Sequence, residues 1–570
     1  MVNLTINGQA VEAQDDATIL CAANEAGVEI PTLCWMKDLN IIGSCRVCLV
    51  DLEGEGLVTA CETPVREGMV VRTDTPAVMA ARRAELQALM DDHRAMCATC
   101  VRQETCALRD LASKYNVADS PYVIRDKGEW DETFPLQRDA SKCIKCMRCV
   151  AECEKVQYCK VWDFTGAGPQ MRVTTKEGLP IAAAGCAACG QCITHCPTGA
   201  LTARDDIDPI MAKILDPNVV TVVQSAPAVR AAWGEGVGLT REEATPGRMA
   251  AAMRRLGFDH VYDTDFAADL TIMEEGTEFI EWYTEGKPRP MFTSCCPGWV
   301  RFAKLHYPDF VGQLSSSKSP HQMMGAVVKN LLRKKAENEG KEIFVVSIMP
   351  CVAKKYECSV PQLATEAGPD VDAVLTVREF DRYLRLMNID CAALPEESFD
   401  DPLCATTGAA TIFGRTGGVM EAALRTAAFL LTGENPPFEV CDTTESTPEK
   451  PWIAKELSVA GLDLRIAVAS GLGNTAKLLD ALRDGTEKFD FVEIMACPGG
   501  CVGGGGQPIE FNKELAAERA CVLNTLDEND TLRYSHENPD IQRLYAEVLD
   551  KPLSHLAEEW LHTDQEAWDI

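Results

Sequence analysis

The distribution of cysteine constrains this chain more than any other feature. Of its 27 cysteines, 17 lie in the first 200 of 570 residues. Disulfide frameworks suit small secreted domains, whereas this chain is long and its opening segment, MVNLTINGQAVEAQDD, has no secretory signal pattern. We therefore expect a cytoplasmic protein whose cysteines bind metal, with a Cys-rich front end and a separate, larger body.

Two runs of cysteine share one spacing. The first is Cys143-x2-Cys146-x2-Cys149-x3-Cys153, and the second is Cys186-x2-Cys189-x2-Cys192-x3-Cys196-Pro197. This repeat is typical of bacterial ferredoxins with two 4Fe-4S clusters, in which the fourth cysteine of each run binds the other cluster. Cys196 should therefore complete the first set and Cys153 the second. Two zinc ribbons are the alternative, but zinc gives no reason for a third cysteine at this spacing.

Two further ligand sets precede these runs. Residues 2–6 predict a strand, Asn7-Gly8 a hairpin turn and residues 18–26 a helix, before an array of Cys34, Cys45, Cys48 and Cys61. Four thiolates suit a 2Fe-2S cluster of plant ferredoxin type, although the first interval is ten residues and not four; tetrahedral zinc is the alternative. The segment 75–110 is expected to begin as a helix and then to carry His93, Cys97, Cys100 and Cys106. These four ligands suit either a 4Fe-4S cluster or a zinc knuckle.

The pattern changes after residue 208. Short apolar runs alternate with helical segments, which predicts an α/β body with buried strands at residues 219–223, 343–348, 464–469 and 489–495. Three cysteine motifs follow such runs: TSCCPGW from Thr293, MPCVAKK from Met349 and MACPGGC from Met495. Open α/β sheets bind ligands at the carboxyl ends of their strands, so Cys296, Cys351, Cys497 and Cys501 could hold a further cubane.

These three motifs resemble the signature motifs of iron-only (FeFe) hydrogenases, and the resemblance covers essentially the whole chain. The module order is similar to that of the large monomeric clostridial type. The resemblance implies a multidomain α/β and α+β fold in four parts. These are a β-grasp 2Fe-2S domain (1–78), a small one-His/three-Cys 4Fe-4S domain (79–125), a two-cluster ferredoxin domain (126–208) and a two-lobed α/β catalytic domain (209–570).

The resemblance also implies an H-cluster, a 4Fe-4S cubane joined through one thiolate to a diiron unit with CO, cyanide and azadithiolate. Cys296, Cys351, Cys497 and Cys501 match the cubane ligands, with Cys501 as the bridge. Because one thiolate would tether the diiron unit, packing and hydrogen bonds must hold the rest. The matching pocket residues are Lys354, Pro227, Ala228, Met349, Pro350, Met495 and Phe413. Ala228 stands where the family often has Ser.

Cys295 is the other member of the vicinal pair, and a thiol can give and take a proton near neutral pH. The resemblance implies a proton path from Cys295 through water to Glu275, Ser315 and then Glu278. Glu275 and Glu278 would share one helix face, where exposed carboxylates are the plain alternative. Trp282 stands where the outer end of this path usually has Arg, and an indole cannot relay a proton.

The function implied is the reversible interconversion of protons, electrons and dihydrogen. Electrons from ferredoxin or a similar small carrier would enter through one 2Fe-2S and three accessory 4Fe-4S clusters, and maturation proteins would build the diiron unit. A non-catalytic electron-transfer or hydrogen-sensing protein and a subunit of an NAD-linked complex are alternatives. Because no further cluster motif follows Cys521, a stand-alone monomer is favoured.

The charge balance argues against polyanionic partners. With 55 Lys and Arg against 86 Asp and Glu, the net charge is −31, which repels nucleic acids and anionic membranes. No run of apolar residues is long enough to span a membrane. An acidic ferredoxin would need a local basic patch, for which Arg82, Arg83 and Arg94 are candidates or else ordinary solvated residues.

Several other patterns are expected to be structural. Gly471-x-Gly473-x2-Ala476, with Asp490 and Glu493 downstream, is a weak dinucleotide fingerprint that the resemblance instead assigns to core scaffold. The run Gly503 to Gly506 lacks the residues of a phosphate loop and suggests close backbone approach to a cluster. The cysteines that match no ligand position are expected to pack as small apolar groups: Cys21, Cys159, Cys358, Cys391, Cys404, Cys441 and Cys521.

Overall fold

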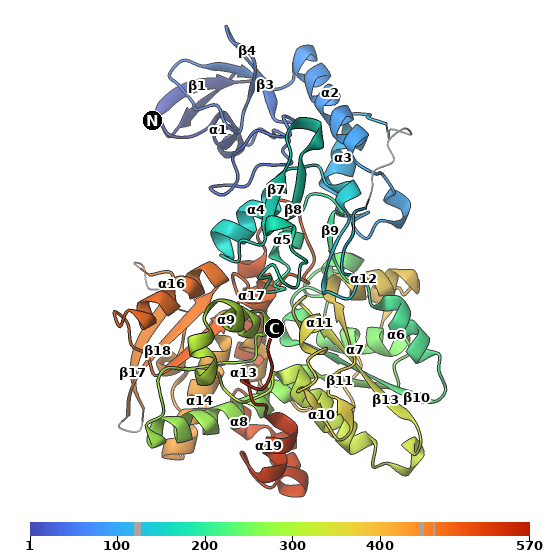
Figure 1. The fold of residues 1–570 in the computed structure, drawn as a ribbon, viewed down its shortest axis with the longest axis vertical. Helices are drawn as coiled ribbons and strands as arrows, with labels where there is room; N and C mark the ends of the chain where they lie inside the picture. The colour runs from blue at the N-terminus through green and yellow to red at the C-terminus, as the bar shows by residue number, and fades with distance from the viewer. Residues whose placement is uncertain (119–126, 445–449, 460–461) are drawn as a thin grey trace.

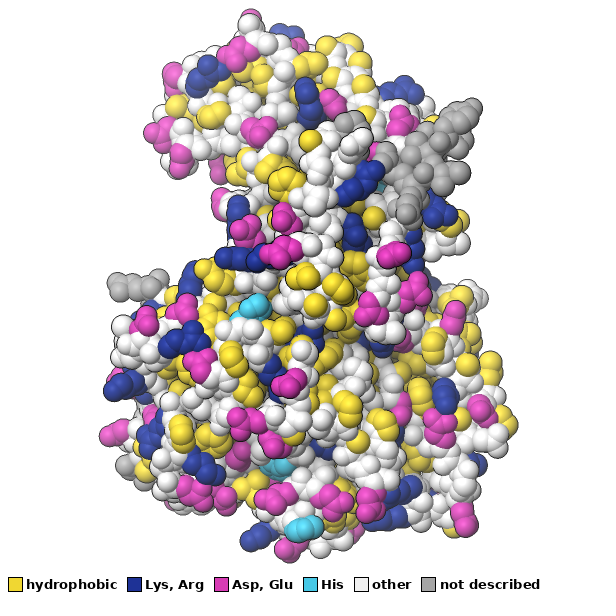
Figure 2. Space-filling view, in the orientation of Figure 1, with side chains coloured by type: hydrophobic (Ala, Val, Ile, Leu, Met, Phe, Trp, Pro, Cys, Tyr) yellow, Lys and Arg dark blue, Asp and Glu magenta, His cyan; other side chains and the backbone are white. Residues whose placement is uncertain are grey.

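The computed structural model describes residues 1–118, 127–444, 450–459 and 462–570. The molecule is elongated, with a narrow N-terminal part above a broad two-lobed body, and the chain ends near the middle of that body (Figure 1). The space-filling view in Figure 2 shows the same narrow upper part and wide lower part. Within the described residues, no helix is both long and apolar enough to cross a membrane.

The first part of the chain is a five-stranded sheet with strand order β2-β1-β5-β3-β4. Its strands are β1 (Val2–Ile6), β2 (Gln9–Ala13), β3 (Leu49–Leu52), β4 (Gly56–Thr59) and β5 (Val70–Arg72). The predicted hairpin is confirmed, since Asn7 and Gly8 both have positive φ and β1 pairs with β2 antiparallel. The predicted helix is α1 (Ile19–Glu25), which the side chain of Thr18 caps by accepting from the Cys21 amide.

Helix α2 (Pro76–Asp92) ends directly before His93, and α3 (Ala107–Lys114) follows the three cysteines of that set. Arg82 on α2 is buried, so its predicted place in a surface patch is wrong. Its Nε donates to the Leu49 carbonyl at 2.9 Å and its Nη1 to the Tyr115 hydroxyl at 3.1 Å. Arg82 therefore ties α2 to the first sheet.

Residues 127–208 contain two short antiparallel ladders. One pairs β6 (Leu136–Arg138) with β9 (Leu201–Ala203), and the other pairs β7 (Trp162–Thr165) with β8 (Arg172–Thr175). Short helices form the second half of each cysteine run: α4 (Arg148–Ala151), continued by η3 (Glu152–Val156), in the first run and α5 (Gln191–Thr194) in the second. Because β6 precedes the first run and β9 follows the second, their pairing folds the two runs against each other.

Two four-stranded sheets form the lobes of the body (Figure 1). One has order β11-β10-β13-β16 and is parallel throughout, with β10 (Val219–Ser225), β11 (His260–Asp263), β13 (Glu342–Met349) and β16 (Ala373–Thr376). The other has order β12-β19-β18-β17, with β12 (Met291–Phe292), β17 (Ile453–Val459), β18 (Leu462–Ser470) and β19 (Phe491–Met495). All four strands predicted from apolar runs are confirmed. Every residue of β10 and β19 is buried, as in parallel sheets covered on both faces.

Helix α8 (Thr264–Glu285) lies between the lobes and packs against α10 (Pro320–Leu332) on one side and α14 (Gly418–Thr432) on the other. Because most of its surface is covered, its buried acidic side chains must either find partners inside the protein or remain protonated. The other helices of eight or more residues that the structure describes in the lobes are α6 (Ile207–Ile214), α7 (Pro246–Arg255), α9 (Pro297–His306), α12 (Val377–Leu386) and α16 (Leu472–Arg483).

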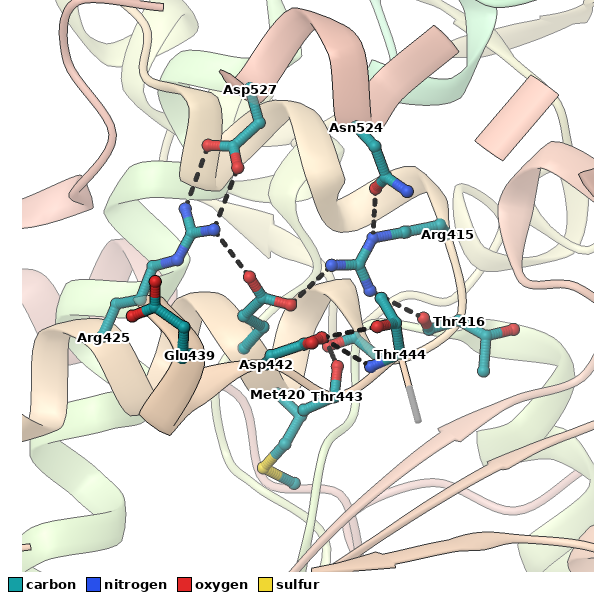
Figure 3. A network of polar contacts seen from close by, with 12 residues as sticks. Arg415, Thr416, Met420, Arg425, Glu439, Asp442, Thr443, Thr444, Asn524 and Asp527 are labelled. Carbon is teal, nitrogen blue, oxygen red and sulfur yellow. Dashed lines mark hydrogen bonds and ion pairs between the residues drawn. The ribbon is translucent and has the colours of Figure 1, made fainter. Parts of the chain in front are cut away.

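The C-terminal helices α17 (Ala516–Asn529), α18 (Pro539–Leu544) and α19 (His555–Leu561) pack on this body. Figure 3 shows the polar network between α14 and α17, in which Arg425 donates to both carboxylate oxygens of Asp527 at 3.0 and 2.9 Å. Glu421 accepts from Arg425 and Arg415, and Arg415 Nε donates to Asn524 at 2.6 Å. Since these buried charges are all paired, the network fixes the loop that starts α14.

Candidate functional site

A largely apolar cavity lies where β10, β13 and β19 end between the lobes. About 570 Å³ of space there is not filled by protein atoms. Its lining includes Cys295, Cys296, Cys351 and Cys501 and all seven predicted pocket residues: Pro227, Ala228, Met349, Pro350, Lys354, Phe413 and Met495. Ala226, Thr264, Pro297, Pro320, His321 and Gly414 complete the lining. The site therefore lies at the predicted edge of the sheets.

Four thiols from three separate motifs meet beside this cavity: Cys296, Cys351, Cys497 and Cys501. Burial raises the pKa of each thiol, to about 12 at Cys497, and neighbouring sulfurs of the set add to the effect at the last three. Four such thiols cannot ionise together unless positive charge lies among them. The iron of a cluster supplies that charge, so this donor set fits a cubane.

Lys354 is the charged side chain in the cavity wall. Its Nζ donates to the Cys295 carbonyl at 3.1 Å and to Glu357 at 2.9 Å. Burial lowers the pKa of Lys354, but the Glu357 carboxylate outweighs it, so that the net shift is upward. Burial raises the pKa of Glu357, whereas Lys354 and His321 bring it down to about 2. Lys354 is therefore a charged donor, and Glu357 and His321 are positioning residues that the sequence analysis missed.

The loop that carries Pro227 and Ala228 is held from behind. Arg230 Nε donates to the Pro227 carbonyl at 3.1 Å, and its Nη2 donates to Asp263 and Asp265 at 2.7 and 2.6 Å. Gln507 donates to the Ala228 carbonyl at 3.0 Å. This part of the wall is consequently fixed by buried charge and not by packing alone.

The predicted proton residues also lie together. Glu275 is fully buried, and neither of its carboxyl oxygens has a hydrogen-bond partner. Burial, with a contribution from Glu278, raises its pKa to about 8. Ser315 Oγ donates to Glu278 at 2.6 Å. Burial, and to a smaller extent the charge of Glu275, raises the pKa of Cys295. Cys295 and Glu275 therefore both hold a proton at neutral pH.

Glu275 and Glu278 are both on α8, so the predicted helix and its shared face are confirmed. Trp282 lies one turn further along α8, and its Nε1 donates to the Pro288 carbonyl at 2.7 Å. Its only polar atom is therefore engaged away from Glu278.

The two ferredoxin-like runs are interleaved. Cys196 lies within electrostatic range of Cys143, Cys146 and Cys149 and contributes to the raised pKa of each. Cys153 does the same for Cys186, Cys189 and Cys192. This is the neighbourhood that crossed ligation requires. Cys159 is buried beside Cys153, outside both sets.

The other two sets belong to the front end of the chain. Cys34, Cys45, Cys48 and Cys61 are all buried, and the sulfurs of the last two are 3.4 Å apart. His93 Nδ1 lies 2.9 Å from the Lys142 carbonyl, which assigns the hydrogen to Nδ1 and the lone pair to Nε2, the atom that would bind a metal. Arg102 is buried with two guanidinium nitrogens unpartnered beside Cys100, Cys106 and Cys196. An anionic cluster would complement that charge.

Short contacts connect neighbouring cluster sites. Asn40 Nδ2 donates to the carbonyls of Cys34 at 2.7 Å and Cys146 at 2.9 Å. Arg102 Nη2 donates to the Cys196 carbonyl at 3.2 Å, and Cys497 Sγ lies 3.9 Å from the Cys189 carbonyl. The front-end sites thus adjoin the first ferredoxin-like set, and the second set adjoins the central cavity.

Within the described residues, no group of three or more His, Cys, Asp or Glu side chains converges as it would on a single metal ion. In a cubane each thiolate binds a different iron, which separates the sulfurs.

The glycine patterns serve packing. A Cβ at Gly505 would lie 2.3 Å from the Cys189 carbonyl, and one at Gly504 would lie 2.2 Å from that of Pro350. The glycine run therefore packs on the backbone that carries Cys189 and, next to Pro350, Cys351, which are candidate ligands. A Cβ at Gly473 would meet the Val156 carbonyl at 2.4 Å, and Gln157 lies 3.3 Å from the Leu472 amide, so protein covers the start of α16. The scaffold interpretation of this pattern is confirmed.

The remaining cysteines differ in exposure. Cys391 and Cys441 are buried as predicted, and Cys21, Cys358 and Cys404 are partly buried. Cys521 is exposed, so the prediction that it packs as a small apolar group is wrong. It lies on α17, which covers the body with one face only.

Family models match most of the chain. The model described as iron only hydrogenase large subunit, C-terminal domain, matches residues 219–505. A 2Fe-2S iron-sulfur cluster binding domain matches residues 1–76, and an NADH-ubiquinone oxidoreductase-G iron-sulfur binding region matches residues 82–121. The iron hydrogenase small subunit matches residues 513–566.

Individual relatives agree with these matches. The chain is 44% identical to the NADP-reducing hydrogenase subunit HndD of Solidesulfovibrio fructosivorans, covering 99% of this chain and 98% of the relative. It is 35% identical to iron hydrogenase 1 of Clostridium pasteurianum, covering 99% of each. A solved structure of the apo [FeFe]-hydrogenase HydA1 from Chlamydomonas reinhardtii is 41% identical with a TM-score of 0.58, covering 63% of this chain and 98% of that one.

Proposed function

This chain belongs to the iron-only hydrogenase family and is a hydrogenase, and from that premise we propose that it catalyses the reversible reaction 2H⁺ + 2e⁻ = H₂ at an H-cluster. One observation carries the proposal. One cavity is lined by three of the four candidate ligand cysteines, with Cys497 beside Cys296, and by a charged lysine and a further thiol, Cys295, outside that set.

Cys296, Cys351, Cys497 and Cys501 would hold the cubane, with Cys501 bridging to a diiron unit. The H-cluster supplies the iron site at which hydrogen is formed or split. An ammonium group has three hydrogens, and Lys354 uses two of them on Cys295 and Glu357. The third is available to a cyanide ligand as a charge-assisted donor. Pro227, Ala228, Met349, Pro350, Phe413 and Met495 form the apolar wall that excludes water.

Protons would reach the cavity through Cys295, Glu275, Ser315 and Glu278. Because Cys295 and Glu275 both hold a proton at neutral pH, each can pass one inward and be refilled from behind. Ser315 bridges to Glu278 through its hydroxyl. The hydrogen bond between Ser315 and Glu278 supports the outer step of this order, and water would connect Cys295 to Glu275, whose carboxyl oxygens have no hydrogen-bond partner.

Electrons would pass through four accessory clusters. The proposed ligands are Cys34, Cys45, Cys48 and Cys61 for 2Fe-2S; His93, Cys97, Cys100 and Cys106 for the first 4Fe-4S; and the two interleaved sets for the others. The corresponding domains would be residues 1–78, 79–125, 126–208 and 209–570. The contacts of Asn40 and Arg102 favour two entry ports that meet at the Cys143 set.

The electron carrier has two candidates. A small carrier such as ferredoxin would serve a stand-alone monomer, with maturation proteins supplying the diiron unit. A partner subunit is the second candidate, because the relative at 44% identity is named as a subunit of an NADP-reducing hydrogenase. Purified protein mixed with ferredoxin or with NADP⁺ distinguishes them, since only the first reaction would proceed without another subunit.

The experiment that tests the function is hydrogen evolution from reduced methyl viologen by matured, anaerobically purified protein, with an infrared spectrum of the same sample. We expect evolution together with CO and cyanide bands. Bands without turnover would favour a sensor, and no bands after full maturation would leave an electron-transfer protein.

A further inference from the structure

The segment after α19 lies against the loop that carries Ser315. Residues Ser317 and His562 form an isolated antiparallel bridge. The Lys318 amide donates to the Leu561 carbonyl and the Thr563 amide to the Ser316 carbonyl, both at 2.8 Å. This pairing fixes the His562 ring beside Ser316.

A continuous line of hydrogen bonds runs from Glu278 to this histidine and beyond. Ser316 Oγ lies 2.8 Å from Glu278 Oε1 and 2.8 Å from His562 Nδ1. His562 Nε2 lies 3.1 Å from Glu274 Oε2. The Ser316 hydroxyl has one hydrogen for two neighbours, so its direction must depend on which neighbour carries the proton.

The far end of the line is rigid. Glu274 is fully buried, and it also accepts from the Tyr545 hydroxyl and from the Leu553 amide at 2.9 Å. The titratable groups around this line are Glu274, Glu275 and Glu278 from α8 and Tyr545 from η14 (Tyr545–Leu549). His562 therefore lies between two carboxylates. It contacts Glu274 directly and reaches Glu278 through Ser316.

We propose that Ser316, His562 and Glu274 form a proton-storing branch that refills Glu278. In the loaded state, the imidazolium donates Nδ1–H to Ser316 and Nε2–H to Glu274, while Ser316 donates to ionised Glu278. In the transfer, the Ser316 hydrogen moves to Glu278 Oε1 and the Nδ1 hydrogen moves to Ser316 Oγ. One proton and one positive charge leave the ring, which stays bound to Glu274 through Nε2–H.

This branch rests on the proposed function, because Glu278 is taken to serve hydrogen chemistry. It also fits the position of Trp282, whose indole is bonded to Pro288 and offers Glu278 no proton. The histidine comes from the segment matched by the small-subunit family model, so that segment would contribute directly to proton supply.

The first test replaces the ring without removing its hydrogen bond to Ser316. In His562→Asn, we expect hydrogen evolution to fall on the order of tenfold at alkaline pH. This loss is smaller than the 10²–10⁴ typical of a positioned acid or base, because water can still reach the half-buried Glu278. At acid pH the loss should shrink, because hydronium can protonate the half-buried Glu278 directly. His555→Asn, at an exposed histidine of the same segment, is the matched control and should leave the rate unchanged.

The second test needs no turnover. The chain has eight histidines, so an NMR spectrum of protein with ¹⁵N-labelled imidazole rings contains few signals. The two ring-nitrogen signals of His562 are identified as those that disappear in His562→Asn. We expect Glu278→Gln and Ser316→Ala to shift the His562 ring signals, whereas Glu281→Gln, at an exposed position of α8, should not.

Wild-type rates in His562→Asn at every pH, or ring signals unaffected by Glu278→Gln, would overturn the branch. If His562→Asn does not fold, Ser316→Ala decides by the same two readouts. A wild-type protein that evolves no hydrogen would instead refute the proposed function, whatever the ring signals show.

Discussion

Lys354 and Glu357 form a buried ion pair within a single helical turn, with Nζ 2.9 Å from Oε2 and both side chains in the interior beside the central cavity. His321 closes the pair from the other side, with Nδ1 3.1 Å from Ser347 Oγ and Nε2 against Glu357. The pair fixes where the lysine points and keeps it charged. The wall of the candidate catalytic cavity therefore depends on a carboxylate that does not line it.

Glu357→Gln should be strongly destabilising. It leaves the Lys354 charge without its partner, and breaking a buried pair from one side lowers the free energy of unfolding by about 3–5 kcal/mol. Denaturant unfolding of the catalytic body measures the change. Lys354→Met combined with Glu357→Leu removes both charges and should recover most of the free energy of unfolding. The cyanide bands should not return, because the lysine donor is missing. A Glu357→Gln variant as stable as the wild type would show that the pair does not hold the wall.

Cys295→Ala should abolish most turnover while leaving the cofactor in place. Removal of a positioned proton donor typically lowers a rate by about 10²–10⁴. The infrared bands should persist, because Cys295 is outside the proposed ligand set. Cys521→Ala, at an exposed thiol, is the control. Bands lost together with activity would assign Cys295 a structural or ligand role.

Glu275 should make stability depend on pH in a defined direction. Its pKa is raised by burial from 4.5 to about 8 in the folded state. Between these values the folded chain keeps a proton that the unfolded chain loses, so stability falls as pH rises and the loss is complete above about pH 8. Glu275→Gln should flatten this slope, and the infrared carboxylic acid band near neutral pH should vanish in the variant. An unchanged slope would contradict the buried, protonated state.

Gly505→Ala should displace the loop that carries Cys501. Its Cβ would lie 2.3 Å from the Cys189 carbonyl and 2.7 Å from the Gly190 Cα, so the backbone must move. We expect loss of the infrared bands and a lower unfolding midpoint. Gly276→Ala is the control, since its Cβ meets nothing within 4 Å and alanine favours a helix by roughly 1 kcal/mol over glycine. Normal cofactor content in Gly505→Ala would refute the close-packing explanation.

Local patterns predicted much of the fold. The Asn7-Gly8 hairpin and strands β10, β13, β18 and β19 follow from turn chemistry and apolar runs, which act over a few residues. Arg82 was misplaced because a charged residue on a helix normally faces water, whereas here the Leu49 carbonyl and Tyr115 hydroxyl accept its hydrogens. Nothing near Arg82 in sequence signals those partners.

The residues of the candidate site also fall into those that local sequence patterns predicted and those that they did not. The cysteines of the cavity, Lys354 and the two methionines came from three motifs, and Pro227, Ala228 and Phe413 came from the family resemblance; the structure brings them together. Glu357 could have been found, because it stands three residues after Lys354, a spacing that brings two side chains together on a helix such as α11 (Lys354–Glu357). His562 and Glu274 could not, because they are 288 positions apart and meet only through tertiary packing. Spacing in the sequence predicts pairs of residues that are close along the chain, whereas partners far apart in the sequence are found only from the folded structure.

The most direct test of the central claim is isotope exchange between D₂ and H₂O by the matured protein, without any electron carrier. Heterolytic cleavage of hydrogen in the cavity, coupled to the proton route, predicts HD in the gas phase, and Cys295→Ala should suppress it while keeping the CO and cyanide bands. A matured protein that shows those bands but forms no HD would contradict the account.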